Sequence, residues 1–258
     1  LRQALGDRRG VAALLGSLGN LATHEGDYAA ATALLEQALA IQQELGNRQQ
    51  VAYTLNSLGI LALYRDDHAG GQALMEQALA IRRELGDRQG VGVLLNNLGN
   101  IACYQGDFVG ARQLLEESLA LMRELGDRRG VGASLDSLGD VARRQEDYAA
   151  ARALYRECLQ VRRELGDMRG LAVSLEGMAR VLWAQGEPEK AVRLWAASQA
   201  LLEQIGTLLV PNEREEHERQ VAQARAGLGE VAFSIAWEQG QALTAAQALA
   251  LALEERAG

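Results

Sequence analysis

The chain repeats itself with a period of 40 residues. A Glu-Leu-Gly-Asp/Asn-Arg tag recurs at residues 44–48, 84–88 and 124–128, and at 164–168 with Met in the last place. A second tag, Ser/Asn-Leu-Gly, lies at residues 17–19, 57–59, 97–99 and 137–139. The spacing never changes, so no copy contains an insertion. Fixed periods of 20 to 50 residues are typical of arrays of stacked units and not of a single globular core.

Each copy predicts two helices. In the third copy, Leu94, Leu95, Leu98 and Ala102 follow the rhythm of an amphipathic helix, and a second apolar stripe runs from Phe108 to Leu119. The composition agrees, because Leu and Ala dominate and the 258 residues include only 2 prolines.

Short Gly-Asp pairs are expected to separate the helices. Gly106 and Gly126 are placed to end a helix, and Asp107 and Asp127 to cap the next one. In the fifth copy, Pro188 follows this boundary at the first helical position, where its missing N–H costs nothing.

The 40-residue pattern stops after Gly206. The sequence then predicts a linker at 207–211, a charged helix at 213–226 and a helix at 231–239 ended by Gly240. A capping box at Thr244–Gln247 opens a last helix that runs to Glu255.

Residues 1–6 match the last turn of a second helix, Leu1 with Ile41 and Leu5 with Leu45. We therefore expect at least half a repeat upstream. Three parts are predicted: the end of a truncated preceding repeat (1–6), five helix pairs (7–206) and C-terminal capping helices (207–258).

The repeat resembles the tetratricopeptide repeat in a 40-residue form. In the third copy the landmarks of that family fall on Leu95, Leu98, Gly99, Gly106, Phe108, Ala111, Leu115 and Ser118. His68 and Pro188 depart from the aromatic position held by Tyr28, Phe108 and Tyr148. The resemblance implies an all-α, right-handed solenoid of helix pairs with a helical C-terminal cap.

A second resemblance covers residues 228–244. This stretch looks like the C-terminal end of large bacterial signalling ATPases and transcription regulators of the STAND type. In those proteins an oligomerising nucleotide-binding module precedes a helical-repeat sensor. The resemblance implies an upstream NTPase module in the parent chain.

Charge and cysteine usage exclude several classes of function. The net charge is −8, the pI is about 5.1 and the basic residues form no patch, so no direct nucleic-acid binding is expected. No apolar run approaches the ~20 residues of a membrane span. Cys103 and Cys158 lack partners at disulfide or metal spacing, which favours a reducing cytoplasm.

No constellation of catalytic residues can be assembled. The segment 227–232 fits GxGxxA, but a helical segment precedes it where a dinucleotide site needs a strand. His24, His68 and His217 lie in different elements and are expected to be surface or packing residues. We therefore predict a protein that is not an enzyme and has no cofactor or metal site.

The first helices of such a solenoid line a concave wall, which is where a partner is expected to bind. The polar residues of this wall are the candidate site: Asn56, Asn96, Asn97, Asn100, Tyr104, Asp136, Asp140, Arg143 and Arg144. An Asn amide offers a donor and an acceptor together, as an extended peptide backbone does. The resemblance agrees, since related repeat proteins hold peptide main chain with Asn ladders. Alternatively, these Asn bond across helix pairs or face water.

The sequence thus favours partner recognition in the groove, with a peptide or protein ligand, as the sensor of a larger cytosolic NTPase or regulator. A constitutive adaptor and a structural spacer are the alternatives. The ligand itself, which includes the option of a small molecule, stays open.

Overall fold

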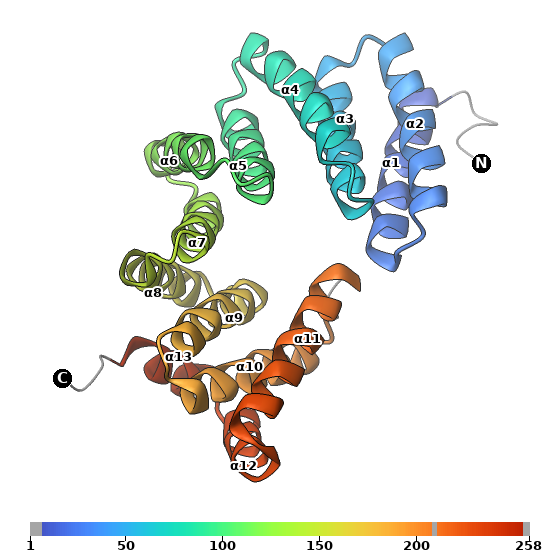
Figure 1. Ribbon diagram of the computed structural model, residues 1–258. Helices are drawn as coiled ribbons and strands as arrows, with labels where there is room; N and C mark the ends of the chain where they lie inside the picture. The colour runs from blue at the N-terminus through green and yellow to red at the C-terminus, as the bar shows by residue number, and fades with distance from the viewer. Residues whose placement is uncertain (1–6, 208–210, 255–258) are drawn as a thin grey trace. The chain divides into compact units, whose positions relative to one another are not determined.

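The computed structural model describes residues 7–207 and 211–254, with residues 211–213 described by their backbone alone. Within these residues the chain forms thirteen helices and no strand. Five helix pairs come first: α1 (Arg8–Glu25) with α2 (Tyr28–Glu44), α3 (Arg48–Tyr64) with α4 (His68–Glu84), α5 (Arg88–Tyr104) with α6 (Phe108–Leu125), α7 (Arg128–Arg144) with α8 (Tyr148–Leu165), and α9 (Met168–Ala184) with α10 (Pro188–Gln204). They are followed by α11 (Pro211–Leu228), α12 (Glu230–Gln241) and α13 (Ala245–Leu253) (Figure 1). The all-α array of helix pairs is confirmed.

The chain divides into two compact units, and the boundary lies inside α6. The first unit contains α1 to α5 and α6 up to Leu121. The second contains α6 from Met122, then α7 to α13 apart from the first two residues of α11.

One aspartate serves two helices at a joint. At the α5–α6 joint, the Gly106 N–H donates to the Cys103 carbonyl (3.2 Å) and the Asp107 N–H to the Ala102 carbonyl (2.9 Å), which closes the end of α5. The Asp107 carboxylate then accepts from the Gly110 N–H (2.9 Å) at the start of α6. The predicted roles of Gly106 and Asp107 are confirmed.

Glycine holds the left-handed position at most joints, since it has no Cβ to clash there. Two joints differ. Asp66 (φ 62°) and Glu146 (φ 61°) occupy the equivalent position. Asp tolerates this conformation better than Glu does, so the joint at Glu146 is the more strained of the two.

Glycine also allows the two helices of a pair to approach each other. A Cβ on Gly139 of α7 would lie 2.9 Å from the Tyr155 ring of α8. Tyr155 is fully buried, as is Trp195, which stands at the equivalent place in α10. Both aromatic residues therefore belong to the core.

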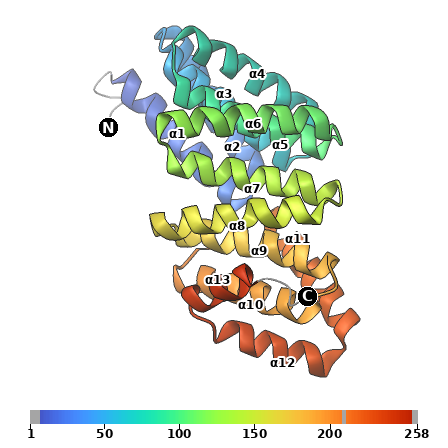
Figure 2. The ribbon, with the colours of Figure 1, turned by 90° about the vertical axis from the view of Figure 1, so that its left-hand side faces the viewer.

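The C-terminal helices cover the end of the second unit. Both α12 and α13 pack against α10, and α13 also reaches α9 and α8 (Figure 2). The capping box predicted at Thr244 is present. Arg152 and Arg156 of α8 donate to the backbone carbonyls of Glu254 (2.6 Å) and Leu253 (2.7 Å) at the end of α13.

Two of the predicted boundaries are wrong. Gly240 does not end α12, which continues to Gln241. A side chain at Gly240 would overlap the Arg193 backbone of α10, so this glycine serves close packing. Pro211, predicted in the linker, is the first residue of α11, and this helix extends to Leu228. The predicted end at Glu255 lies outside the described residues.

In the part of the chain that the structure describes, no helix combines the length and apolarity needed to cross a bilayer.

Candidate partner-binding surface

In both units the first helices of neighbouring pairs contact each other, α1 with α3 and α7 with α9. We call the polar side of these first helices the first-helix wall. Residues 40 apart occupy equivalent places on it, so Asn96 and Asn100 of α5 correspond to Asp136 and Asp140 of α7. The same places in α9 are taken by Glu176 and Arg180.

In the first unit, two of the predicted asparagines bind each other. The Asn97 amide of α5 donates to the Asn56 carbonyl oxygen of α3 at 2.9 Å. Both side chains are half-buried. This pair is therefore a clamp between two repeats, which is the alternative that the sequence left open for the Asn cluster.

The other two asparagines are not engaged in this way. Asn96 and Asn100 lie one turn apart on α5, and both are half-buried. Within the described residues, the Asn96 Oδ1 is buried without a hydrogen-bond partner. A buried polar atom without a partner costs about 1–3 kcal/mol, so an incoming donor would be favourable here.

Tyr104 lies at the C-terminal end of α5 and is exposed. Its ring stacks on His68 of α4, with centroids 5.9 Å apart and 16° between the planes. Tyr64 and Tyr28 form the equivalent stack one repeat earlier, at 6.1 Å and 5°. His68, which departs from the aromatic pattern of the family, thus keeps the stacking contact. Tyr104 belongs to a contact between repeats and also has an exposed surface.

In the second unit, Asp136 is held by neighbouring helices. Its Oδ1 accepts from the Ser174 hydroxyl of α9 at 2.8 Å, and its Oδ2 lies 3.7 Å from the Arg162 guanidinium of α8. Burial raises the pKa of Asp136, although Arg162 and Ser174 act in the opposite direction. Asp136 joins three helices, as an internal contact of the unit.

Asp140 pairs within its own helix. Arg143 donates to the Asp140 Oδ1 at 2.8 and 3.0 Å. Burial opposes the ionisation of Asp140, but Arg143 and Arg180 outweigh it and hold its pKa below the usual value. Arg144 is exposed, while Arg143 is half-buried.

Cys158 of α8 forms a hydrogen bond to α7, the first helix of the same pair. The Cys158 thiol donates to the Gly132 carbonyl at 3.1 Å, just as Ser118 donates to Gly92 (2.8 Å) one repeat earlier. Burial, with Asp136 nearby, raises the pKa of Cys158 to about 12. The thiol stays protonated at neutral pH, so Cys158 has a structural role and is not a nucleophile.

The wall of the fifth pair is covered by the chain itself. Helix α11 runs alongside α9 (Figure 1). His217 Nδ1 lies 3.1 Å from Glu176 Oε1, and the Arg180 guanidinium donates to Gln220 Oε1 at 2.9 Å. His217 is buried, and Ala224 is fully buried on the same side of α11.

Trp183, one turn beyond Arg180, completes this contact. The ring centroids of Trp183 and Trp195 are 6.0 Å apart. A Cβ added at Gly227 of α11 would lie 3.1 Å from the Trp183 ring. In α9, therefore, the stripe equivalent to Asn96 and Asn100 is already occupied.

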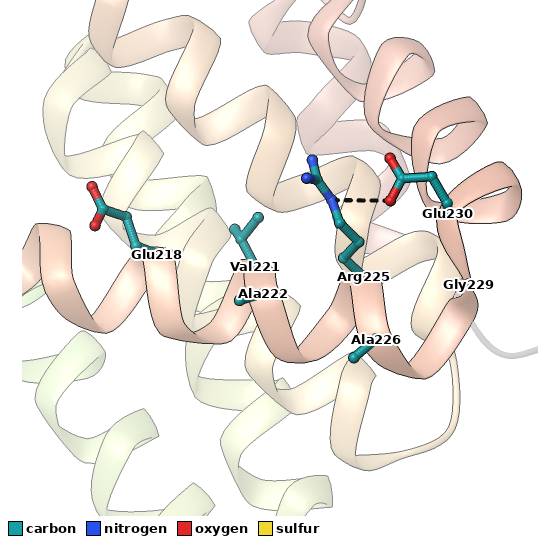
Figure 3. A pocket seen from close by; sticks show the side chains of 7 residues that line it. All are labelled: Glu218, Val221, Ala222, Arg225, Ala226, Gly229 and Glu230. Atoms are coloured by element: carbon teal, nitrogen blue, oxygen red, sulfur yellow. Dashed lines mark ion pairs between the residues drawn. The ribbon is translucent and has the colours of Figure 1, made fainter.

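A hollow of about 630 Å³ lies on the outer side of α11, where this helix meets α12 (Figure 3). Its lining consists of Glu218, Val221, Ala222, Arg225, Ala226, Gly229 and Glu230. At one end Arg225 and Glu230 point toward each other and form an ion pair of 3.7 Å. Every lining residue except Val221 is exposed. The hollow thus has no buried polar group that could orient a ligand.

The structure brings the predicted residues together as two separate sets, and each set belongs to one unit. Asn56, Asn96, Asn97, Asn100 and Tyr104 lie in the first unit, and Asp136, Asp140, Arg143 and Arg144 in the second. Sequence reasoning missed Arg162 and Ser174, which hold Asp136. Their contacts join three helices, and no spacing in the sequence indicates them. In the described residues, no three His, Cys, Asp or Glu side chains lie where they could hold a metal ion.

The sequence matches the family model of the tetratricopeptide repeat over residues 10–84, 90–164 and 132–204, which together span more than half of the chain. The chain belongs to the tetratricopeptide repeat family. Proteins of this family bind peptide or protein partners, and they are typically scaffolds or adaptors without catalytic activity.

Solved structures share the fold. BtubC from P. vanneervenii is 23% identical, with a TM-score of 0.63 over 81% of this chain and 87% of its own. Aspartyl phosphate phosphatase F from Bacillus subtilis is 13% identical, with a TM-score of 0.65 over 90% and 70%. PilF from Pseudomonas aeruginosa is 18% identical, with a TM-score of 0.56 over 92% and 99%. Likeness at these identities supports the fold alone. No curated protein matches the chain.

Proposed function

We propose that the chain recognises a peptide or protein partner with the first-helix wall of its first unit, and that Asn96 and Asn100 make the central contacts. The observation that carries this proposal is the Asn96 Oδ1, which is buried without a hydrogen-bond partner in the described residues. Asn97, the next residue along α5, instead donates to Asn56 of α3. The two free amides are spaced to meet successive polar groups of an extended backbone.

Other residues of the first unit define the borders of this site. The Asn97–Asn56 clamp fixes α5 against α3 and so positions the two free amides. Tyr104 offers an exposed aromatic face at the end of α5. A partner with a backbone donor and a neighbouring apolar side chain fits this arrangement.

In the second unit, the proposal assigns partner contacts to the outer charges. Arg144 is exposed, and Asp140 with Arg143 is partly accessible. Asp136 acts through the packing of α7 against α8 and α9, because Arg162 and Ser174 already engage its carboxylate.

We further propose that this array is the sensor of a larger cytoplasmic signalling protein with an NTPase module upstream. The support is the resemblance of residues 228–244 to the ends of such proteins. Partner binding would then shift an equilibrium in the attached module. A constitutive adaptor would use the same wall and switch nothing. A nucleotide-binding module directly upstream in the full-length protein would favour the sensor.

The test compares two sets of Asn variants. Random dodecapeptides displayed on phage are selected on the 258-residue chain, and one selected peptide is synthesised for calorimetric titration. Asn96→Ala combined with Asn100→Ala should weaken its binding about tenfold to a hundredfold, the effect of losing about 1–3 kcal/mol of hydrogen bonding. The melting temperature should stay within a few degrees, because Ala has the higher helix propensity.

Asn97→Ala is the control, because it removes the clamp and leaves both free amides in place. It should lower the melting temperature more than the double variant and reduce affinity less. Unchanged binding of the peptide by the double variant would refute the proposed site. Unfolding of the double variant would show that Asn96 and Asn100 are structural.

A further inference from the structure

Helix α1 carries an apolar stripe on its surface. Leu14, Leu18 and Leu21 are 52%, 51% and 52% exposed. Their spacing of four and three residues places them on one face of α1. Leucine side chains with half of their surface in water normally occur singly, whereas a row of three marks a contact surface.

The equivalent residues of later repeats are buried. In α5 they are Leu94, Leu98 and Ile101, which are 2%, 6% and 1% exposed. In α3, Leu58 and Leu61 are 9% and 2% exposed. The repeat therefore places these residues in a core, and α1 is the exception among the described first helices.

The helix that buries them is the second helix of the preceding pair. Leu94, Leu98 and Ile101 of α5 form one apolar cluster with Met75 and Leu79 of α4. Leu58 and Leu61 of α3 cluster in the same way with Leu35 and Ala31 of α2. For α1, no described helix stands in the corresponding place.

The sequence just before α1 has the pattern of such a helix. Leu5, Gly6 and Asp7 repeat the Leu85-Gly86-Asp87 sequence that joins α4 to α5. Asp7 caps α1 by accepting from the Gly10 N–H at 2.8 Å, as Asp87 accepts from Gly90 at 2.9 Å. The capping half of a regular joint is thus present at α1.

We infer that the Leu14, Leu18 and Leu21 stripe is a docking surface for one more helix with the apolar pattern of α2 and α4, joined to α1 by the same two-residue turn. A second copy of the chain is a poorer occupant. Its α2 is packed between α1 and α3, and its α4 between α3 and α5, so neither helix has a free face of this kind.

The test grafts a helix of this type onto the whole chain. A copy of residues 68–86, which hold α4 and its joint, replaces residues 1–6. Helix α4 is the appropriate donor because its neighbour α5 carries Leu, Leu and Ile where α1 carries three Leu. The graft should raise the melting temperature by about 5 °C and slow amide exchange in α1 at least tenfold.

Leu18→Asp is the matched variant. In the original chain it should change the melting temperature little, because this side chain is half exposed. In the grafted chain it should remove the gain. Sedimentation equilibrium of both chains measures whether either one dimerises, which is the result expected if a second copy occupies the stripe.

Each remaining outcome contradicts the inference. A graft that gives no gain, or a gain that Leu18→Asp leaves intact, shows that the stripe does not take a helix of this type. An original chain that dimerises, with the dimer lost on Leu18→Asp, shows that a second copy is the occupant.

Discussion

The first-helix walls of the two units have equivalent backbone positions, but one carries neutral amide side chains and the other carries charged ones. The wall of the first unit carries neutral amides, of which Asn97 and Asn56 are paired while Asn96 keeps a buried oxygen without a partner. In the second unit the equivalent places hold Asp136, Asp140, Glu176 and Arg180, all engaged in ion pairs or hydrogen bonds. An open wall and an internally satisfied wall can thus arise from one repeat.

The two walls also differ in what lies on them. Helix α11 covers α9 through His217 and Gln220. In the described residues of the first unit, Asn96 stands at the place of Glu176, and its Oδ1 has no such partner. The repeat pattern therefore identifies where a groove can be, and the side chains decide whether it is free.

The largest expected effect tests whether the charged wall is a structural element. Arg162→Ala should lower the free energy of unfolding by about 3 kcal/mol, because it leaves the Asp136 carboxylate buried without its cation. Urea unfolding followed by circular dichroism measures this loss. Arg123→Ala, which breaks the exposed pair with Glu157, should cost less than about 1 kcal/mol. Equal losses in the two variants would contradict the role given to Arg162.

A second prediction concerns the close approach of α7 and α8. Gly139→Ala should destabilise the chain by about 2 kcal/mol, because the new methyl group meets the rigid Tyr155 ring at 2.9 Å. Gly16→Ala in α1 is the control, since nothing lies within 4 Å of its added Cβ. It should raise stability by up to about 1 kcal/mol through helix propensity. If Gly139→Ala left the free energy of unfolding unchanged, α8 would have shifted to make room for the methyl group.

The third prediction uses pH. Burial disfavours the charge on Glu187, but hydrogen bonds from Arg152 and Lys190 outweigh it and lower its pKa below the ordinary 4.5. Its contribution to stability is therefore complete above that value and is lost as the pH falls through the lower folded-state pKa. Glu187→Gln should cost about 1.5 kcal/mol at pH 7, and the cost should shrink as the pH falls below the ordinary pKa of 4.5. Thermal melts across this range measure the difference, and a constant difference would rule out the ionic role.

The smallest effect is a gain. Glu146→Gly should raise stability by about 0.5–1 kcal/mol, because Glu146 has the left-handed φ of 61° that glycine adopts without strain. Asp66→Gly in the first unit should gain less, since Asp tolerates this conformation better. Thermal melts of the two variants give the ranking, which the reverse order would contradict.

Local features of the sequence were enough to predict the fold. The joint at Gly106 and Asp107 depends on residues adjacent in the chain, and the helix pairs follow from the period. The partners of the wall residues depend on how neighbouring helices are rotated. That Asn97, and not Asn96, meets Asn56 could not be read from spacing. Nor could the hydrogen bonds from Arg143 to Asp140, since Arg143 and Arg144 both lie about one helical turn from it.

Helix α11 shows the other limit. Its sequence is charged and has lost the repeat tags, so it was predicted as part of a cap without a defined place. Its position depends on two contacts with α9, His217 with Glu176 and Gln220 with Arg180. Each contact joins residues about forty positions apart in the chain. Such contacts are specific to individual side chains and leave no periodic signal.

The shared aspartate of each joint limits how the array can change in length. Asp107 closes α5 through its backbone and opens α6 through its side chain, so one inserted or deleted residue would separate these two tasks. Within a helix, such a change would also turn the residues after it by about 100° about the helix axis relative to those before it. Gene rearrangements that add or remove a complete module of forty residues keep both tasks on one side chain. Variation within a module is then confined to substitution, and the amides of one wall and the charges of the other are a difference of this kind.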